Sequence, residues 1–303
     1  MDLVLAYVDG NDPQWQADYA AFVGGKPLQK RFRDWGTLPY LLRGIQRNMP
    51  FIERVFLVVA RESQVPAWLD PETVRVVLHR DFIPEEYLPL FNASSLELFL
   101  PRIPDLGERF LYFNDDIFPL LPLQEDDFFV DGKPAKGYAR QLLACGDFQR
   151  LARRADRLAC RVAGQRPGLG YYRPQHCCTP LLRSEGLRHL ACLEPQLPAL
   201  VSRIRAAGNV NQYFFSDALL REGKAVNRRI SCRHVSLAAV SGRRLESLLR
   251  KPGRKLICIN DVEMPERRFR SLRDCLLAAF SRRFPSPSRF ERSGDHPEAG
   301  AVH

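Results

Sequence analysis

Five short runs of apolar, strand-forming residues, most of them ending in polar side chains, constrain the fold of this chain more than any other feature. They are residues 3–8, 55–60, 74–78, 110–113 and 256–259. Nearly continuous apolar strands separated by helix-like segments are typical of a parallel sheet covered on both faces. The sequence therefore predicts an α/β fold with a mostly parallel central sheet flanked by helices.

Acidic or amide side chains follow four of these runs. The clusters are Asp9 and Asp12, His79 and Asp81, Asn114 to Asp116, and Asn260 and Asp261. Any one cluster could simply cap the next helix. Ligands of open α/β sheets bind beyond the carboxyl ends of the strands, so four such clusters together favour a functional site over four separate caps.

The charge of the chain is unevenly distributed. The 303 residues carry a net charge of +10, but residues 1–139 hold 14 basic against 21 acidic side chains, while residues 140–303 hold 31 against 14. The first part could hold a metal ion and the second could attract anions. Polyphosphate, nucleic acid and an anionic membrane all fit this balance.

No apolar run approaches the roughly 20 residues of a membrane-spanning helix, and no signal-like segment opens the sequence. We therefore expect a cytoplasmic protein. It could also associate peripherally with the inner face of the membrane or with a capsule-synthesis complex. The eight cysteines show no C-x-x-C spacing. Buried, reduced thiols are the expected reading, rather than a zinc site.

An arginine-rich segment at 140–166 is predicted to be a helical insert, with Leu151, Ala155 and Leu158 on one face and most arginines on the other. A membrane-surface helix, a solvated helix and a docking face for a polyanion all remain open, and the thin apolar face favours the last two. Residues 285–303 are expected to be a disordered tail.

The adjacent carboxylates Asp115 and Asp116 would repel each other at a strand end unless a cation joined them. Ligation by oxygen alone suits Mg²⁺ or Mn²⁺ bridging to a substrate phosphate. Further upstream, the segment Lys30-Arg31-Phe32-Arg33-Asp34 places three cations before a predicted helix. It reads equally well as a phosphate-binding segment and as a surface charge run.

Several segments, taken in order, resemble the four conserved regions of the Stealth family of sugar-1-phosphate transferases. They are AYVDGNDPQW, RFRDWGTLPYLLRGIQRNMPFIERVFLVV, VPAWL, FNASSLELFLPRIPDLGERFLYFNDDIF, the stretch 176–223 and KLICIND. The resemblance implies a single catalytic domain over 1–284, similar to the GT-A glycosyltransferases, and a divalent metal. It also implies a donor of the UDP-sugar type and a glycan or capsular polysaccharide acceptor, with no nucleic acid partner.

In that chemistry an acceptor hydroxyl attacks the phosphorus next to the sugar, which releases a nucleoside monophosphate and leaves a phosphodiester. The resemblance implies a role for each matching residue. The expected metal ligands are Asp115, Asp116 and Asp261; the expected catalytic residues are His176 as general base, Asp116, Arg203 and Arg205; the expected substrate contacts are Asp9, Asp12, Arg31, Arg33, Asp34, Asn114, Asp217 and Asn260.

The chain departs from the family pattern at two positions. Ser94 stands where many members have a histidine, and Ile204 stands where a phenylalanine is usual. Two other functions stay open from the residues alone. One is an ordinary glycosyltransferase that releases a nucleoside diphosphate, and the other is a non-enzymatic module that binds a polyanion through arginine-rich segments.

Overall fold

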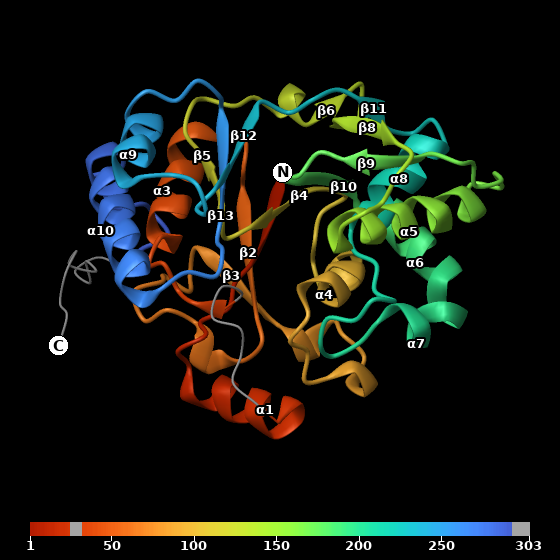
Figure 1. Cartoon of the computed structure of the whole chain (residues 1–303), viewed down its shortest axis with the longest axis horizontal. Helices are drawn as coiled ribbons and strands as arrows, with labels where there is room; N and C mark the ends of the chain where they lie inside the picture. The colour runs from red at the N-terminus through yellow and green to blue at the C-terminus, as the bar shows by residue number, and fades with distance from the viewer. Residues whose placement is uncertain (25–31, 293–303) are drawn as a thin grey trace. The chain divides into compact units, whose positions relative to one another are not determined.

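The computed structural model describes residues 1–24 and 32–292 of the chain. The chain forms two compact units, each built from separate stretches of sequence (Figure 1). Unit 1 comprises residues 1–2, 77–112 and 125–230, and unit 2 comprises residues 3–76, 113–124 and 231–303. The sequence predicts one domain over 1–284, and the boundaries between the units fall within that range.

The five apolar runs all form strands, as predicted. They are β1 (Asp2–Ala6), β2 (Arg54–Val59), β3 (Val74–Leu78), β4 (Arg109–Asn114) and β13 (Leu256–Asn260). The largest sheet has the order β10-β4-β1-β2-β3 and is mostly parallel, with β10 (Thr179–Leu182) antiparallel to β4. The predicted α/β fold with a mostly parallel central sheet is therefore confirmed.

The last of the five runs lies in a different sheet. Strand β13 pairs in parallel with β12 (Cys232–Ser236) and antiparallel with β5 (Ile117–Pro119), in a three-stranded sheet of unit 2. The turn at Asp115 and Asp116 connects β4 directly to β5. Strand β5 then pairs with β13, with Cys258 opposite Ile117. The acidic end of β13 is thereby brought to the acidic turn after β4.

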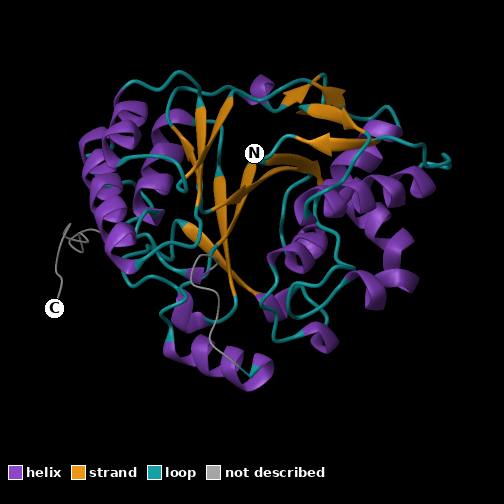
Figure 2. Ribbon diagram, in the orientation of Figure 1, coloured by secondary structure: helices purple, strands orange, loops and turns teal. Residues whose placement is uncertain are grey.

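Unit 2 also contains helices, which are purple in Figure 2. They are α1 (Pro13–Val23), α3 (Leu38–Asn48), α9 (Gly242–Arg250) and α10 (Glu266–Arg283). Helix α3 packs closely on β5 because it carries a glycine at the contact. A Cβ atom at Gly44 would lie only 3.0 Å from the carbonyl oxygen of Pro119. The leucine and isoleucine stripe of α3 is buried, as its spacing predicts.

Unit 1 contains the remaining elements. Its helices are α4 (Ala93–Phe99), α5 (Asp147–Val162), α6 (Arg183–Leu193), α7 (Leu197–Leu200) and α8 (Tyr213–Arg221). Its further strands are β6 (Phe129–Val130), β7 (Lys133–Lys136), β8 (Tyr138–Gln141), β9 (Tyr171–Pro174) and β11 (Val226–Asn227). Asn92 caps α4, since its side-chain oxygen accepts a hydrogen bond from the Ser94 backbone N–H at 3.1 Å.

The arginine-rich helix α5 is an integral part of unit 1. Its apolar residues Ala152, Ala155, Leu158 and Ala159 are buried, and the helix packs on α8 and β9. Asp156 on the same face is buried and forms an ion pair with Arg221 of α8. The apolar face of α5 is therefore occupied, and the helix does not lie on a membrane by that face.

The C-terminal segment is ordered further than the sequence predicts. Phe290 is buried, and the Glu291 carboxylate accepts two hydrogen bonds from the Arg43 guanidinium on α3, at 2.9 and 2.5 Å. The expectation of a disordered tail from residue 285 is corrected for 285–292, because one aromatic residue and one ion pair hold this segment on unit 2. Residues 293–303 lie outside the described part of the chain.

Candidate active site

A tight contact between two loops begins the site in unit 2. The Gly10 N–H donates to the carbonyl oxygen of Phe32 at 2.8 Å, and a Cβ atom at position 10 would lie 2.0 Å from that oxygen. Only glycine allows this approach. The contact brings the turn that carries Asp9 against the segment that carries Arg33 and Asp34.

Carboxylates from four separate segments gather in unit 2, and their charges add to desolvation in raising the pKa of Asp115 and Asp34. Desolvation, then the charges of Asp116, Asp34 and Asp261, raise the pKa of Asp115 to about 7. Desolvation is also the main cause of the raised pKa of Asp34, with Asp9 adding to it. The Asp115 side chain nevertheless reaches solvent. A cluster of this kind attracts a cation, because a cation relieves both the repulsion and the desolvation.

Arg33 is the buried cation of this cluster. Its side chain is 8% exposed, and its Nε lies 3.2 Å from Oδ2 of Asp261. Its guanidinium carbon lies 4.6 Å from the centroid of the Phe269 ring. Nη1 and Nη2 have no hydrogen-bond partner among the described residues. A buried guanidinium with unused N–H groups on both Nη atoms is poised to bind an oxyanion such as a phosphate or a carboxylate.

Asp116 has one engaged oxygen and one unused oxygen. The Cys258 thiol donates to Oδ2 at 3.4 Å, whereas Oδ1 is buried and accepts no hydrogen bond from any residue that the structure describes. Desolvation raises the pKa of Asp116 to about 6. An orphaned carboxylate oxygen costs free energy unless a ligand satisfies it.

Asp261 is held in place by several contacts. Its Oδ2 accepts a hydrogen bond from Trp35 Nε1 at 3.0 Å, and Oδ1 accepts one from the Val262 N–H at 2.6 Å. Trp35 in turn packs edge-on against Phe269 of α10, with 4.7 Å between the ring centroids. Asp261 thus anchors the Arg33 segment, and as a metal ligand it would use its remaining lone pairs.

The other predicted residues of unit 2 have simpler surroundings. Asp12 caps α1 through Gln14 and accepts a hydrogen bond from Ser63 Oγ at 2.7 Å. Asn114 and Asn260 are the last residues of β4 and β13. Asp12 therefore fits the simpler reading of a helix cap. Arg31 lies outside the described residues.

The predicted residues His176, Arg203, Arg205 and Asp217 belong to unit 1. Nδ1 of His176 lies 3.2 Å from the Tyr213 hydroxyl, and its ring packs edge-on against Phe148. The imidazole is half-buried, and the contact between Nδ1 and the Tyr213 hydroxyl orients the ring. His79, in contrast, is buried and its pKa is lowered to about 4 by desolvation, which keeps it neutral.

A buried polar network within unit 1 joins residues 91–97 to residues 202–205. The Asn92 side-chain nitrogen donates to Ser95 Oγ and to Asn209 Oδ1, both at 2.9 Å, and to the Ser202 carbonyl at 3.0 Å. The Asn209 side chain also accepts a hydrogen bond from the Ala206 N–H at 2.6 Å and donates to the Leu200 carbonyl at 3.1 Å. The network holds Arg203 and Arg205 on a fixed backbone, with the Arg205 side chain exposed.

Asp217 lies in the interior of unit 1. Its side chain is 0% exposed, and both carboxylate oxygens are buried without a hydrogen-bond partner within the described ranges. Desolvation raises the pKa of Asp217 well above its ordinary value. The buried Lys136 is near, and its ammonium donates to Thr179 Oγ1 and to the Cys178 carbonyl. This environment suits a supporting role better than substrate contact.

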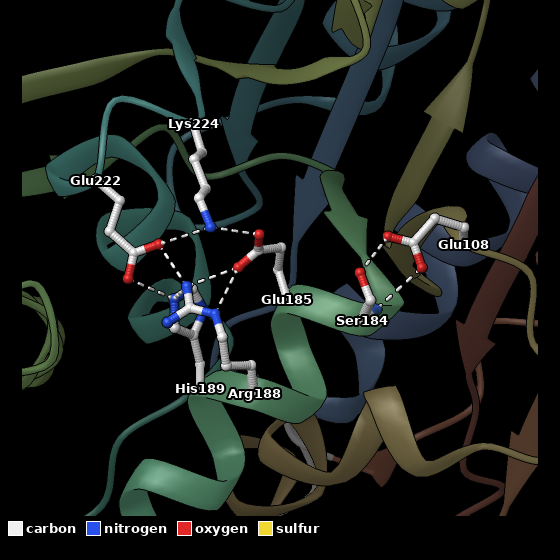
Figure 3. A network of polar contacts seen from close by, with 7 residues as sticks. All are labelled: Glu108, Ser184, Glu185, Arg188, His189, Glu222 and Lys224. Atoms are coloured by element: carbon white, nitrogen blue, oxygen red, sulfur yellow. Dashed lines mark hydrogen bonds and ion pairs between the residues drawn. The ribbon is translucent and has the colours of Figure 1, made fainter.

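A second group of titratable residues ties α6 to the end of α8 (Figure 3). Donor atoms of Glu185, His189 and Glu222 lie within 4.8 Å of one another, which is a metal-like spacing. However, Arg188 bridges both carboxylates and Lys224 pairs with Glu185. The cations already neutralise the carboxylates, so we read this group as an ion-pair network that stabilises unit 1.

Several residues of the cluster are absent from the sequence-based set. Trp35 directly follows the Arg33-Asp34 pair, and Cys258 lies two residues before Asn260 on β13. Period-two alternation along β13 could have identified Cys258, because alternate strand residues share a face. A lone thiol in an apolar strand gave no other signal.

The donor set of unit 2 fits a divalent metal ion. It offers carboxylate oxygens, an exposed Asp115 and the orphaned Oδ1 of Asp116, and these are the oxygen ligands that Mg²⁺ and Mn²⁺ prefer. Asp115 and Asp116 would hold the ion, with Asp261 beside them.

Comparison with protein families gives two matches. The family description for Stealth protein conserved region 2 matches residues 31–136, and that for conserved region 4 matches residues 246–299. These segments make up more than half of the chain. They contain Arg33, Asp34, Asp115 and Asp116, and Asp261 with its supporting Phe269.

Relatives among curated proteins carry related names. The chain is 40% identical over 144 residues to the receptor polysaccharide phosphotransferase WefC of Streptococcus oralis, an alignment covering 44% of this chain and 43% of that protein. It is 26% identical to the capsular polysaccharide phosphotransferase WcwK of Streptococcus pneumoniae, over 96% of this chain and 99% of that protein. The aligned part thus spans less than half of the first relative.

Among solved structures, the chain is similar to the galactosyltransferase LgtC in complex with donor and acceptor sugar analogues. That similarity has a TM-score of 0.48 at 14% identity and covers 95% of this chain and 96% of the other.

Proposed function

Because this chain belongs to the Stealth family, we propose that it is a capsular or cell-surface polysaccharide phosphotransferase. In this proposal a nucleotide-sugar of the UDP-sugar type donates a sugar-1-phosphate to a hydroxyl of a glycan acceptor. The products are a phosphodiester and a nucleoside monophosphate. The names of the relatives support the transfer of a phosphorus-containing group, and the donor and released nucleotide are our inference.

One observation carries the proposal: the buried Arg33 guanidinium, whose two Nη atoms have no hydrogen-bond partner among the described residues, stands beside carboxylates that repel one another. Arg33 lies within ion-pair distance of Asp261, Asp116 supplies an unused oxygen, Oδ1, and the exposed Asp115 carboxylate lies next to it in the same turn. A pyrophosphate needs both a cationic fork and a metal-binding face. The cluster supports binding of the donor through its diphosphate.

The residues of the cluster divide the work of phosphoryl transfer. A bound Mg²⁺ or Mn²⁺ would neutralise charge on the phosphate oxygens. Arg33 binds a phosphate oxygen through its two Nη groups, and Asp261 and Phe269 keep its guanidinium in place. Cys258 orients the Asp116 carboxylate. Such positioning and charge stabilisation supply most of the catalysis in this reaction class.

We assign the general base to His176 and the further phosphate contacts to Arg203 and Arg205 of unit 1. The hydroxyl of Tyr213, 3.2 Å from Nδ1, holds the His176 ring in place, and in this proposal the imidazole accepts the proton of the acceptor hydroxyl. Asp9, Asp34, Asn114 and Asn260 remain proposed donor contacts of unit 2. Asp12 and Asp217 drop to supporting roles because of their surroundings.

The test is a screen of nucleotide-sugars with a glycan acceptor in the presence of Mg²⁺ or Mn²⁺. Phosphorus NMR of the product and chromatography of the released nucleotide identify the reaction. We expect a phosphodiester signal and a nucleoside monophosphate. Release of a nucleoside diphosphate, with no phosphorus in the glycan product, would overturn the proposal in favour of ordinary glycosyl transfer.

Asp116→Asn provides the negative control for this assay. The variant keeps the size of the side chain but removes the negative charge, so turnover should be abolished while the melting temperature stays near wild type. Asp126→Asn is the matched control, because Asp126 is an exposed acid elsewhere in the chain. A folded Asp116→Asn variant with near-normal turnover would remove Asp116 from the site.

A further inference from the structure

Three leucines form an exposed apolar tip on unit 1. Strands β8 and β9 pair antiparallel, with Gln141 opposite Tyr171. Leu142 and Leu143 follow β8, and Leu169 precedes β9, so all three extend from the same end of the strand pair. We call Leu142, Leu143 and Leu169 the leucine tip.

The leucine tip has a defined conformation. The Tyr171 hydroxyl contacts Gln141 Oε1 at 2.8 Å and the Leu143 carbonyl at 3.2 Å, which ties the two sides together. Leu142 packs over the Gly170 backbone, since a Cβ atom there would lie 3.3 Å from Leu142 Cδ2. These contacts hold the end of the β8–β9 strand pair together, with the leucines exposed.

The leucines of the tip extend almost fully into solvent. Leu142, Leu143 and Leu169 are 64%, 75% and 88% exposed, and Phe148 at the start of α5 is 41% exposed. Of the large apolar side chains that are exposed in the described residues, only Phe22 and Ile204 lie elsewhere. Apolar side chains gathered in this way mark an interaction surface.

Basic residues predominate in the segment that carries the tip. Residues 139–173 contain eight arginines against two acids, Asp147 and Asp156, and Asp156 is buried in its ion pair with Arg221. Arg140 lies at the tip itself, because its Nε would lie 3.2 Å from a Cβ atom at Gly170. Arg166 is exposed in the loop that leads to Leu169.

We propose that the leucine tip and its arginines dock unit 1 onto an anionic membrane surface. Leucines exposed in this way suit a bilayer, which imposes no shape on the groups that enter it. A protein partner needs a surface against which to fit. The positive charge of the exposed arginines complements the negative charge of anionic lipid headgroups. This docking concerns the location of the protein and is independent of the proposed transfer chemistry.

Docking through the tip leaves the rest of the fold unchanged. Helix α5 keeps its apolar face on α8. The proposed membrane contact therefore involves only the end of the β8–β9 strand pair and the start of α5. None of the helices in the described ranges has the length and hydropathy needed to cross a bilayer. The association is accordingly peripheral, reversible and sensitive to ionic strength.

Vesicle flotation tests the proposal with the full chain. One set of vesicles contains equal parts of phosphatidylglycerol and phosphatidylcholine, and the other contains phosphatidylcholine alone. We expect flotation with the anionic vesicles only, weakened at high salt. The triple variant Leu142→Ser, Leu143→Ser, Leu169→Ser should lose at least tenfold in partition, because three apolar side chains no longer enter the bilayer.

The matched control replaces the two other exposed apolar residues, with Phe22→Ser and Ile204→Ser, and should float like wild type. Because all the changed side chains are exposed, both variants should keep the wild-type melting temperature. A tryptophan at the tip, Leu169→Trp, should shift its fluorescence to shorter wavelength with anionic vesicles. Absence of flotation with anionic vesicles, or equal flotation of the triple variant, would overturn the proposal and point to a protein partner.

Discussion

The thiol of Cys258 and the carboxylate of Asp116 form a hydrogen bond, with Sγ and Oδ2 3.4 Å apart. The two residues are 142 positions apart in the sequence. A second bond, from the Ile259 N–H to the Asp116 carbonyl at 2.8 Å, fixes the backbone of the same turn. Strand β13 therefore orients the acidic pair as well as contributing Asp261.

Removal of that thiol should weaken metal binding more than it weakens the fold. We expect Cys258→Ala to raise the Mn²⁺ concentration for half-maximal turnover by about 10- to 100-fold, as loss of an orienting contact does in metal sites. Cys258→Ser keeps a donor and should stay near wild type. Turnover titrated with Mn²⁺ measures the effect, with the exposed Cys192→Ala as control. An unchanged Mn²⁺ titration for Cys258→Ala would mean that the hydrogen bond from Cys258 does not orient the Asp116 carboxylate.

Arg33 should tolerate no replacement, including lysine. Arg33→Lys keeps the charge but loses the planar fork, and its ammonium cannot replace both unused Nη groups. We expect kcat/KM for the donor to fall at least about a hundredfold. Arg267→Lys, at an exposed position on α10, is the control. If both variants keep wild-type kcat/KM, Arg33 does not bind the donor.

His176 should act on turnover and leave donor binding intact. We expect His176→Ala to lower kcat by about 10²- to 10⁴-fold, the range typical of a lost general base, with an unchanged dissociation constant for the nucleotide-sugar. Tyr213→Phe removes the hydroxyl next to Nδ1 and should lower kcat less. Calorimetric titration and melting temperature accompany the kinetics. A variant that unfolds would show instead that His176 is a structural histidine.

The docked segment 285–292 should contribute to stability. Arg43→Met leaves the Glu291 carboxylate buried without its partner, which costs about 3–5 kcal/mol in comparable pairs. Glu291→Gln should cost less, since the amide stays hydrogen-bonded. Chemical denaturation measures both changes. A free energy of unfolding equal to that of wild type for Arg43→Met would show that the segment is not docked.

The same ion pair should make stability depend on pH. Desolvation raises the pKa of Glu291, but hydrogen bonds from Arg43 and Ser288 outweigh it, and the net pKa is lowered from 4.5. The pair therefore stabilises the fold above about pH 4.5, and this contribution is lost as pH falls through the lowered pKa. The difference between wild type and Arg43→Met should shrink below that pH. A constant difference from pH 3 to pH 7 would contradict this assignment.

The sequence predicted those parts of the fold that a single segment specifies. All five apolar runs became strands because each is long and continuous enough to be read alone. The placement of β13 could not be predicted, because it depends on β5, a three-residue strand with no periodicity. Docking of residues 285–292 could not be predicted either, because it depends on the burial of Phe290 and on an ion pair between Glu291 and Arg43, which is far away in the sequence.

The candidate site was predicted unevenly. Asp115, Asp116, Asp34 and Arg33 lie in short motifs whose residue types indicate their chemistry, and the structure gathers them in one unit. Asp217 and Asp12 looked similar in the sequence, yet one is buried in an interior and the other caps a helix. Burial and tertiary partners distinguish these cases, and neither can be read from a motif.

The interleaving of the two units has a consequence for biosynthesis. Unit 2 draws on three stretches of chain, and the last begins at Ser231. While the ribosome is still making unit 1, the turn with Asp115 and Asp116 has neither Asp261 nor Cys258 to hold it. A prematurely terminated polypeptide would lack β13 and could not assemble this cluster, so incomplete translation products should be catalytically silent.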